Sequence, residues 1–441
     1  MQQAVALWAK ASFQQAAKNF GWLLAERLVR FGLGTVVGFV VARHLGPARL
    51  GSLSYGLAVV TLLAVFAGFG LDAVIKRDLL QAPERTAQLL ADGLALRLLA
   101  GLGAALGLLV FMVAGPGSDG GERSILLVLG LLVWQPALLM PELWLQARLL
   151  ARYSAVAQTA ALAVSAGLRL WLVFAGAPLV AFAAASVVEA LLAGVFLHYA
   201  ARRAGLHLGW FTARLESMRR LAAEAGPLAL ASLAIVVYLK IDEVMLRQLV
   251  GPAEVGIYAA ATRLTEIWYF LPAALASSLL PALLRARARG EEDYRRHLQR
   301  YYDLNAVVAY TLAVPVAFAA PWLVRLAYGA PFAASSAIVV VHIWSSVFVF
   351  LGVARGQWLV NERFQRFYLV VTLVGALANI ALNFVFIPRW GGVGAAWATV
   401  IAQAAAAWLS SFCSREVRPV GWMQTRALLV PVLGWRYFLP K

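Results

Sequence analysis

Apolar stretches of about twenty residues follow one another along almost the whole chain, with short polar segments between them. Coiled as a helix, a stretch of that length crosses the roughly 30 Å hydrocarbon core of a bilayer. The pattern predicts twelve membrane spans, which are residues 22–42, 52–71, 93–114, 124–146, 154–175, 178–199, 227–249, 256–280, 304–324, 335–354, 367–387 and 393–412. We therefore expect an all-α membrane protein.

The polar turns reveal an internal repeat. Residues 43–51 read RHLGPARLG and residues 247–256 read RQLVGPAEVG, each between two apolar stretches. A glycine that ends one helix and a proline that begins the next are common, but here the pair recurs at equivalent places. Residues 144–190 also align without gaps on residues 358–404. The chain is therefore predicted to contain two copies of a six-helix unit. Because each copy has an even number of spans, both have the same orientation, as in alternating-access transporters built from parallel repeats.

This repeat predicts five parts of the chain. Residues 1–21 form an N-terminal cytoplasmic segment, 22–199 the first six-helix bundle, 200–226 a basic cytoplasmic linker, 227–412 the second six-helix bundle and 413–441 a cytoplasmic tail. Within the tail, residues 426–439 are too short for a thirteenth span and are expected at the interface. Residues 76–92 and 285–300 are expected to lie as basic amphipathic helices on the inner membrane surface.

Composition agrees with a membrane protein and excludes most other classes. Of 441 residues, 62% are hydrophobic and 13% are charged, whereas about 25% are charged in soluble proteins. The net charge of +17 would suggest nucleic acid in a soluble domain. Here the basic residues lie between spans, so we expect membrane lipids and no nucleic acid as partners. With the N-terminus inside, inner segments hold about four times as many Lys and Arg as outer loops, which predicts that both termini are cytoplasmic.

The sequence predicts neither a cofactor nor a metal site. Cys413 is the single cysteine, so it has no partner for a disulfide or a metal, and the simplest interpretation is an apolar filler. No loop is long enough to fold as a soluble catalytic domain. We therefore expect a transporter that is not an enzyme and has no catalytic residues.

Charged residues inside spans are costly and usually functional. At a rise of 1.5 Å per residue, Arg169, Lys240, Asp242 and Arg263 lie roughly 10 to 14 Å from the outer end of their spans, and Glu189 and Glu266 roughly 15 Å. They are predicted to form one polar layer. The candidate substrate-binding cations are Arg30, Arg169, Lys240 and Arg263, because cations suit an anionic ligand and the guanidinium of arginine can bind two phosphate oxygens at once. The candidates for ion coupling or charge pairing are Glu26, Glu189, Asp242 and Glu266.

Several of these charges have two open interpretations. Glu26, Arg30, Gly34 and Gly38 share one face of the first span. Either Glu26 and Arg30 form a local pair and the glycines a close helix contact, or the charges line a cavity. Likewise, Arg263 and Glu266 are spaced to pair with each other. Arg97, near the inner end of the third span, is expected to extend toward the interface.

The motifs resemble those of Wzx-type polysaccharide flippases. In the first half they are Asn19-Phe20-Gly21-Trp22, residues 43–51 and Phe69-Gly70-Leu71-Asp72. In the second half they are Asp242 followed by residues 251–258, then Tyr328-Gly329 with Phe332, and residues 389–396. The resemblance extends over about residues 15–412.

The resemblance implies a fold like that of the MATE transporters of the MOP superfamily, with two six-helix bundles facing a central cavity. It also implies a bacterial inner-membrane protein that moves an undecaprenyl-pyrophosphate-linked oligosaccharide from the cytoplasmic to the periplasmic leaflet, for O-antigen, capsule or exopolysaccharide assembly. The cationic cavity of such proteins is thought to receive the pyrophosphate and sugar. A glycan polymerase in the same membrane is a possible partner.

Four alternatives stay open at this point. A multidrug MATE antiporter should have an acidic or apolar cavity, and a lipid II flippase resembles this chain less and usually has two more spans. A membrane polymerase normally needs a large loop or a carboxylate cluster for acid-base or metal chemistry, while a transport-inactive scaffold of glycan assembly makes no such demand.

Overall fold

The computed structural model describes residues 2–114, 120–206 and 213–433 and shows an all-helical chain there, without β-strands. Nine helices within this part are long and apolar enough to cross a membrane. Large apolar side chains such as Val113, Phe174 and Phe318 are 86%, 89% and 86% exposed. Hydrocarbon offers the backbone N–H and C=O groups no hydrogen-bond partner, so they must bond to one another, as they do in a helix. The apolar side chains of such a helix then face the lipid. The chain is a multi-pass membrane protein.

The helices divide into two compact units. Unit 1 comprises Met1–Leu45 and Ser52–Val236, and unit 2 comprises Gly46–Gly51 and Val237–Lys441. Helices α1 and α9 each contribute residues to both units. The expected division into two six-helix bundles with a linker at residues 200–226 stays a prediction, although helix α9 begins inside that linker, at Leu215.

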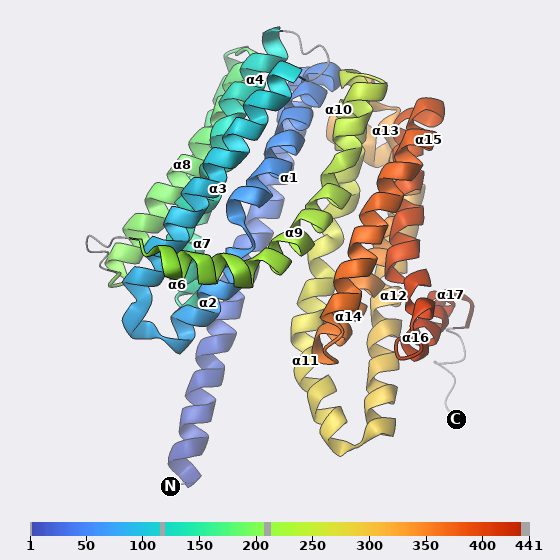
Figure 1. Cartoon of the computed structure of the whole chain (residues 1–441). Helices are drawn as coiled ribbons and strands as arrows, with labels where there is room; N and C mark the ends of the chain where they lie inside the picture. Colours follow the sequence, from blue (N-terminus) through green and yellow to red (C-terminus); the bar gives the residue numbers. More distant parts are fainter. Residues whose placement is uncertain (1, 115–119, 207–212, 434–441) are drawn as a thin grey trace. The chain divides into compact units, whose positions relative to one another are not determined.

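Unit 1 is built mainly from the first nine α-helices (Figure 1). They are α1 (Gln2–Gly68), α2 (Leu71–Gln81), α3 (Thr86–Ala114), α4 (Gly120–Gly130), α5 (Gln135–Leu138), α6 (Met140–Ala147), α7 (Ala151–Phe174), α8 (Leu179–Arg203) and α9 (Leu215–Leu249). Short 3-10 helices lie at Pro83–Arg85 and Leu131–Trp134. Pro227 lies inside α9, where it removes a backbone hydrogen bond, and α9 bends along its length (Figure 1).

The core of unit 1 lies where α2, α6, α8 and the first part of α9 meet. Ile75, Leu145, Leu197 and Leu221 are completely buried there. Polar contacts fasten α9 to α2, since Arg220 forms a salt bridge of 3.1 Å with Asp78. The basic segment before the second repeat is therefore held against the first unit.

Unit 2 contains the remaining α-helices. They are α10 (Pro252–Glu266), α11 (Phe270–Arg289), α12 (Glu291–Tyr328), α13 (Ser335–His342), α14 (Ser345–Asn361), α15 (Gln365–Ala407), α16 (Arg418–Leu428) and α17 (Val430–Leu433). Short 3-10 helices lie at Ile267–Tyr269, Ala330–Phe332 and Leu409–Cys413. The long helices α11 and α12 pair as a hairpin (Figure 1), and Gly290 forms its turn at φ 135°.

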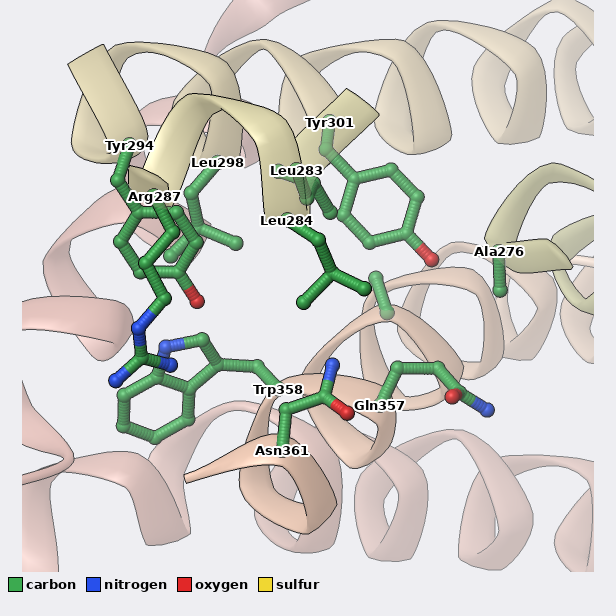
Figure 2. Close-up of a pocket in the computed structure, with 11 residues that line it drawn as sticks. Ala276, Leu283, Leu284, Arg287, Tyr294, Leu298, Tyr301, Gln357, Trp358 and Asn361 are labelled. Atoms are coloured by element: carbon green, nitrogen blue, oxygen red, sulfur yellow. The ribbon is translucent and has the colours of Figure 1, made fainter. Parts of the chain in front are cut away.

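An aromatic cluster stabilises this hairpin against α14. Tyr294, Leu298 and Tyr301 of α12 face Trp358 of α14 around a small pocket (Figure 2). At its edge Arg287 forms a salt bridge of 2.5 Å with Glu362, which raises the pKa of the guanidinium above its usual value. The cavity measures only about 20 Å³, enough for about one water molecule. It is a packing site and not a substrate site.

Two glycines divide the longest helices where the sequence predicts span boundaries. Gly46 in α1 has φ 72° and Gly391 in α15 has φ 54°, a region that glycine enters without strain. Each break separates two predicted spans, first from second and eleventh from twelfth. The span at residues 256–280 is divided instead by the 3-10 helix between α10 and α11. The number of twelve spans stays a prediction.

The two copies of the repeated Gly-Pro turn contact each other inside unit 2. A Cβ atom placed on Gly51 would lie 1.7 Å from the carbonyl oxygen of Pro252, and one on Gly256 would lie 1.9 Å from that of Pro47. The contact is reciprocal, because each glycine meets the proline of the other copy. Only hydrogen in place of a side chain permits this backbone approach.

Three expectations about the polar segments are wrong. Residues 76–92 and 285–300 do not form separate surface helices; each contains a helix end, a turn and the start of the next long helix.

Arg97 does not extend to the interface. It is 2% exposed, forms a salt bridge with the exposed Asp72 and donates to the carbonyl oxygen of Pro136, so these two oxygens replace the lost water.

Two smaller expectations also need correction. Cys413 is exposed, so it does not fill space in the core. Gly34 makes no close helix contact, since a Cβ atom placed there would meet nothing within 4 Å. In the predicted interfacial segment, the described residues up to Leu433 form the last part of α16 and α17, which contact α12. Residues 434–439 lie outside the described residues.

Replacing Gly51 or Gly256 by alanine should destabilise the protein by about 1 to 3 kcal/mol, because the added methyl group overlaps backbone that has no room to move. Thermal denaturation of the purified protein in detergent, followed by intrinsic fluorescence, measures the loss. Gly32→Ala is the matched control, since its Cβ atom meets nothing within 4 Å. Equal melting temperatures for G51A, G256A and G32A would contradict the packing argument.

Candidate functional site

A polar pocket lies inside unit 1, with a volume of about 310 Å³. Helices α1, α7 and α8 supply most of its charged and amide side chains. The polar residues that line it are Arg30, Thr61, Gln135, Gln158, Arg169, Ser186 and Glu189. Three predicted site residues, Arg30, Arg169 and Glu189, are therefore brought together.

Arg30 lies at the centre of the hydrogen bonds in this pocket. Its Nε is 2.7 Å from Glu26 Oε1, and its Nη2 donates to Gln158 Oε1 at 2.6 Å. Its Nη1 is 3.9 Å from Glu189 Oε1. Both interpretations of Glu26 and Arg30 are thus partly right, because the local pair forms and Arg30 also lines the cavity.

Arg169 and Glu189 form the second charged pair of the pocket. Arg169 Nη2 is 2.9 Å from Glu189 Oε2 and 3.3 Å from Ser186 Oγ. Ser165 Oγ donates to Glu189 Oε2 at 3.1 Å. Arg30 and Arg169 therefore contact the two oxygens of one carboxylate, and an anion that enters can compete with Glu189 for both guanidinium groups.

Sequence reasoning missed Glu142 and Gln158, which support Arg30. Gln158 Nε2 donates to Glu142 Oε1 at 2.7 Å, and Ser154 Oγ donates to the same oxygen at 3.2 Å. Glu142 is on α6, inside a predicted span, but at 1.5 Å per residue it lies about 27 Å from the outer end of that span, outside the layer that contains Glu189. Gln158 carries no charge and gave no such signal.

The pocket contains both cationic and anionic side chains, whereas the sequence led us to expect a cavity that is mainly cationic. The lining contains two arginines and one glutamate. Glu26 and Glu142 join the same network of hydrogen bonds. The arginines are therefore already paired, and a ligand anion must exchange places with a carboxylate. The amides and hydroxyls of the lining can hydrogen-bond to sugar hydroxyls.

In unit 2, Asp242 is the most enclosed of the predicted site residues, at 3% exposure. Its Oδ1 accepts from Asn383 Nδ2 at 2.6 Å. Its Oδ2 accepts from Tyr258 OH at 2.6 Å and from Thr399 Oγ1 at 2.7 Å. Helices α9, α10 and α15 thus converge on one carboxylate. The buried Oδ1 of Asn383 has no hydrogen-bond partner among the described residues.

The other predicted residues of unit 2 are less tightly bound. Lys240 Nζ is 2.8 Å from Oε1 of Glu243, an acidic residue that is not among the predicted site residues. Glu266 is half-buried and Arg263 is exposed. Although both are described, no salt bridge joins Arg263 to Glu266, so the predicted local pair does not form.

Arg355 of α14 was also missed, because it falls just beyond the predicted tenth span. It is 2% exposed and donates to Ser410 Oγ, Ser411 Oγ and the Ala406 carbonyl oxygen at 2.7, 2.9 and 2.6 Å. These neutral partners join α14 to the end of α15, which indicates a structural role.

Comparison with known proteins agrees with this arrangement. Residues 16–287 match the family described as polysaccharide biosynthesis protein, which is more than half of the chain. The chain belongs to the polysaccharide biosynthesis protein family. Residues 227–385 also match the MatE family, and the two matches together extend over both units. The resemblance of the motifs to polysaccharide transporters is thereby confirmed at the level of the family.

A curated relative has a similar length. The probable low-salt glycan biosynthesis flippase Agl15 of Haloferax volcanii is 23% identical over 406 residues, which are 88% of this chain and 83% of that protein.

Solved structures show the same fold. The lipid II flippase MurJ in an inward closed conformation has a TM-score of 0.70 at 13% identity, over 96% of this chain and 94% of that one. An inward-facing multidrug resistance MATE transporter of the MOP superfamily has a TM-score of 0.64 at 15% identity, over 91% and 96%. The predicted all-α, MATE-like fold is confirmed. At these identities the likeness extends to the fold and not to the substrate.

Proposed function

We propose that this family member is a glycan flippase that moves a lipid-linked oligosaccharide across the membrane by alternating access. The family match and the similarity to Agl15, named as a glycan biosynthesis flippase, support the proposal. The observation that carries it is the pocket of unit 1, where two arginines lie among amide and hydroxyl groups. Such a lining suits a ligand with both phosphate and sugar.

The finer proposal concerns substrate and orientation. The substrate is an undecaprenyl-pyrophosphate-linked glycan, and it moves from the cytoplasmic to the periplasmic leaflet of the bacterial inner membrane for O-antigen, capsule or exopolysaccharide assembly. Both termini are cytoplasmic, as the excess of basic residues in the inner segments supports. The two six-helix bundles at residues 22–199 and 227–412 act as the moving parts.

In this proposal Arg30 and Arg169 bind the pyrophosphate in unit 1, while Lys240 and Arg263 are the substrate-binding cations of unit 2. Arrival of the anion displaces Glu189 from the two guanidinium groups that it now contacts. Charge-assisted hydrogen bonds are stronger than those between neutral groups. The bonds that the pyrophosphate gains from the two arginines therefore offset part of the free-energy cost of removing it from water. Glu26 holds Arg30 in place through the exchange.

Replacing both arginines should slow flipping strongly. In liposomes with purified protein and a fluorescent polyprenyl-pyrophosphate disaccharide, R30Q/R169Q should lower the initial rate at least about a hundredfold, since hydrogen bonds to charged groups contribute about 1.5 to 3 kcal/mol each. A membrane-impermeant quencher reports the leaflet. R202Q, at an exposed position in the last turn of α8, is the control. Unchanged flipping by folded R30Q/R169Q would overturn the substrate role of these arginines.

Asp242 is the proposed group for the coupling cation, proton or sodium. A carboxylate enclosed by side chains from three helices, beside the unpartnered oxygen of Asn383, supports this choice over a charge that only pairs structurally. Glu26, Glu189 and Glu266 remain candidates for charge pairing.

D242N should abolish the response of flipping to an imposed ion gradient, because the amide keeps the size of the side chain but neither titrates nor attracts a cation. The same liposomes with a proton or a sodium gradient measure the response, and the gradient that drives the native protein identifies the ion. D293N, which removes a carboxylate near the start of α12, is the control. A gradient response that survives in D242N would exclude Asp242.

The same assays separate the proposal from its alternatives. Flipping of lipid II in preference to other glycans would indicate a lipid II flippase, and export of cationic drugs a multidrug antiporter. No transport of any of these by folded protein would favour a polymerase or scaffold role.

A further inference from the structure

A large groove lies between the first turns of α12 and the C-terminal helices α16 and α17. All three helices belong to unit 2, and Figure 1 shows α16 and α17 beside α12. The groove has a volume of about 700 Å³. It is separate from the unit 1 pocket and from Asp242, and the proposed transport does not use it.

The groove crosses the boundary between the charged and the apolar part of α12. From Glu291 to Asp303 this helix is dominated by charged and polar residues, and the predicted span begins at Leu304. Arg296 and Arg300 line the groove on the charged side, and Leu304 and Val307 line it on the apolar side. A membrane places its phosphate groups and its acyl chains on the two sides of such a boundary.

Helix α16 presents the matching pattern on the opposite wall. Arg418, Trp422 and Arg426 follow one another at intervals of four, so they share one face, and all three are exposed. Trp422 and Arg426 line the groove. Tryptophan between arginines is typical of helices that lie at the level of the lipid headgroups.

Hydrogen bonds fix the two walls to each other. Gln299 Nε2 donates to the carbonyl oxygen of Met423 at 3.0 Å, and Tyr310 OH donates to that of Leu428 at 3.0 Å. The groove is therefore a built feature of the fold, held open by contacts on both sides of the charge boundary.

The charges of the groove favour an anion. Four arginines line it, Arg295, Arg296, Arg300 and Arg426, against Glu292 and Asp303. Arg295 and Arg296 have exposed partners one helical turn away, at 2.7 and 3.2 Å, and such pairs are weak. Within the part of the chain that the structure describes, no carboxylate oxygen lies within 4 Å of Arg300 or Arg426. Their guanidinium groups are available to phosphate oxygens.

We propose that this groove binds the headgroup of an anionic glycerophospholipid from the surrounding bilayer. Its phosphate contacts Arg300 and Arg426, Trp422 lies at the level of the glycerol, and an acyl chain follows Leu304 and Val307. A soluble anion would use the arginines but not the apolar wall. The bound lipid joins the C-terminal helices to α12 and so stabilises unit 2.

Native mass spectrometry of the full-length protein in detergent tests this site. Phosphatidylglycerol and phosphatidylcholine are added as a matched pair with the same acyl chains. The native protein should retain phosphatidylglycerol in preference, and R300Q/R426Q should lower its apparent affinity at least about tenfold. R85Q/R202Q removes two exposed arginines of unit 1 and should leave the affinity unchanged.

Three results would overturn the proposal. Retention of phosphatidylglycerol by R300Q/R426Q as by the native protein would exclude the two arginines. Equal loss in R85Q/R202Q would indicate diffuse attraction to the whole basic surface. Full competition by millimolar inorganic phosphate would indicate a site for a soluble anion. A thermal shift that phosphatidylglycerol produces in the native protein, but not in R300Q/R426Q, would support it even if that variant is itself less stable.

Discussion

The cost of placing charge in hydrocarbon governs this structure. A charged side chain inside a membrane must find a partner or a cavity, and each buried charge discussed above has done one or the other. Arg97 forms a salt bridge with Asp72, although the sequence predicted that its side chain would extend toward the membrane interface. Arg30 and Arg169 meet at Glu189 in the lining of the polar pocket of unit 1. Because Arg30, Arg169 and Glu189 all line a pocket of about 310 Å³, there is room beside them for an anion to take the place of the carboxylate.

A second constraint, close backbone packing, explains the repeated turn. Where two helix ends approach closely, small residues make room for the backbones. Gly51 and Gly256 meet this need reciprocally. The repeat that is visible in the sequence is thus also a contact in space. Duplication gave both copies the same Gly-Pro pattern, and the backbone approach makes that pattern necessary.

Much of the fold could be predicted from the sequence, because hydrocarbon imposes a simple rule on length and polarity. The breaks at Gly46 and Gly391 lie at predicted boundaries of spans.

The interaction partners of charged residues were harder to predict than the positions of these residues within the spans. The depth count gathered Arg169 and Glu189 correctly, but it passed over Glu142 and could not detect the neutral Gln158. Arg355 lay just past a predicted helix end. The surface helices expected at residues 76–92 and 285–300 were wrong. A cluster of charged residues follows the end of a span both when a surface helix comes next and when the chain turns directly into the next long helix, so the charge pattern does not distinguish the two cases. The predicted salt bridge between Arg263 and Glu266 does not form, because a spacing of three residues on a helix permits a contact without requiring it.

The central claim is that this protein carries a complete lipid-linked glycan from one leaflet to the other. The most direct measurement is a lipid profile of cells depleted of the protein, with leaflet-specific detection of lipid-linked sugars. We predict that complete undecaprenyl-linked units accumulate on the cytoplasmic side, and their sugars would identify the glycan. Units that reach the periplasm normally but remain unpolymerised would contradict the account and would indicate a role in polymerisation or assembly.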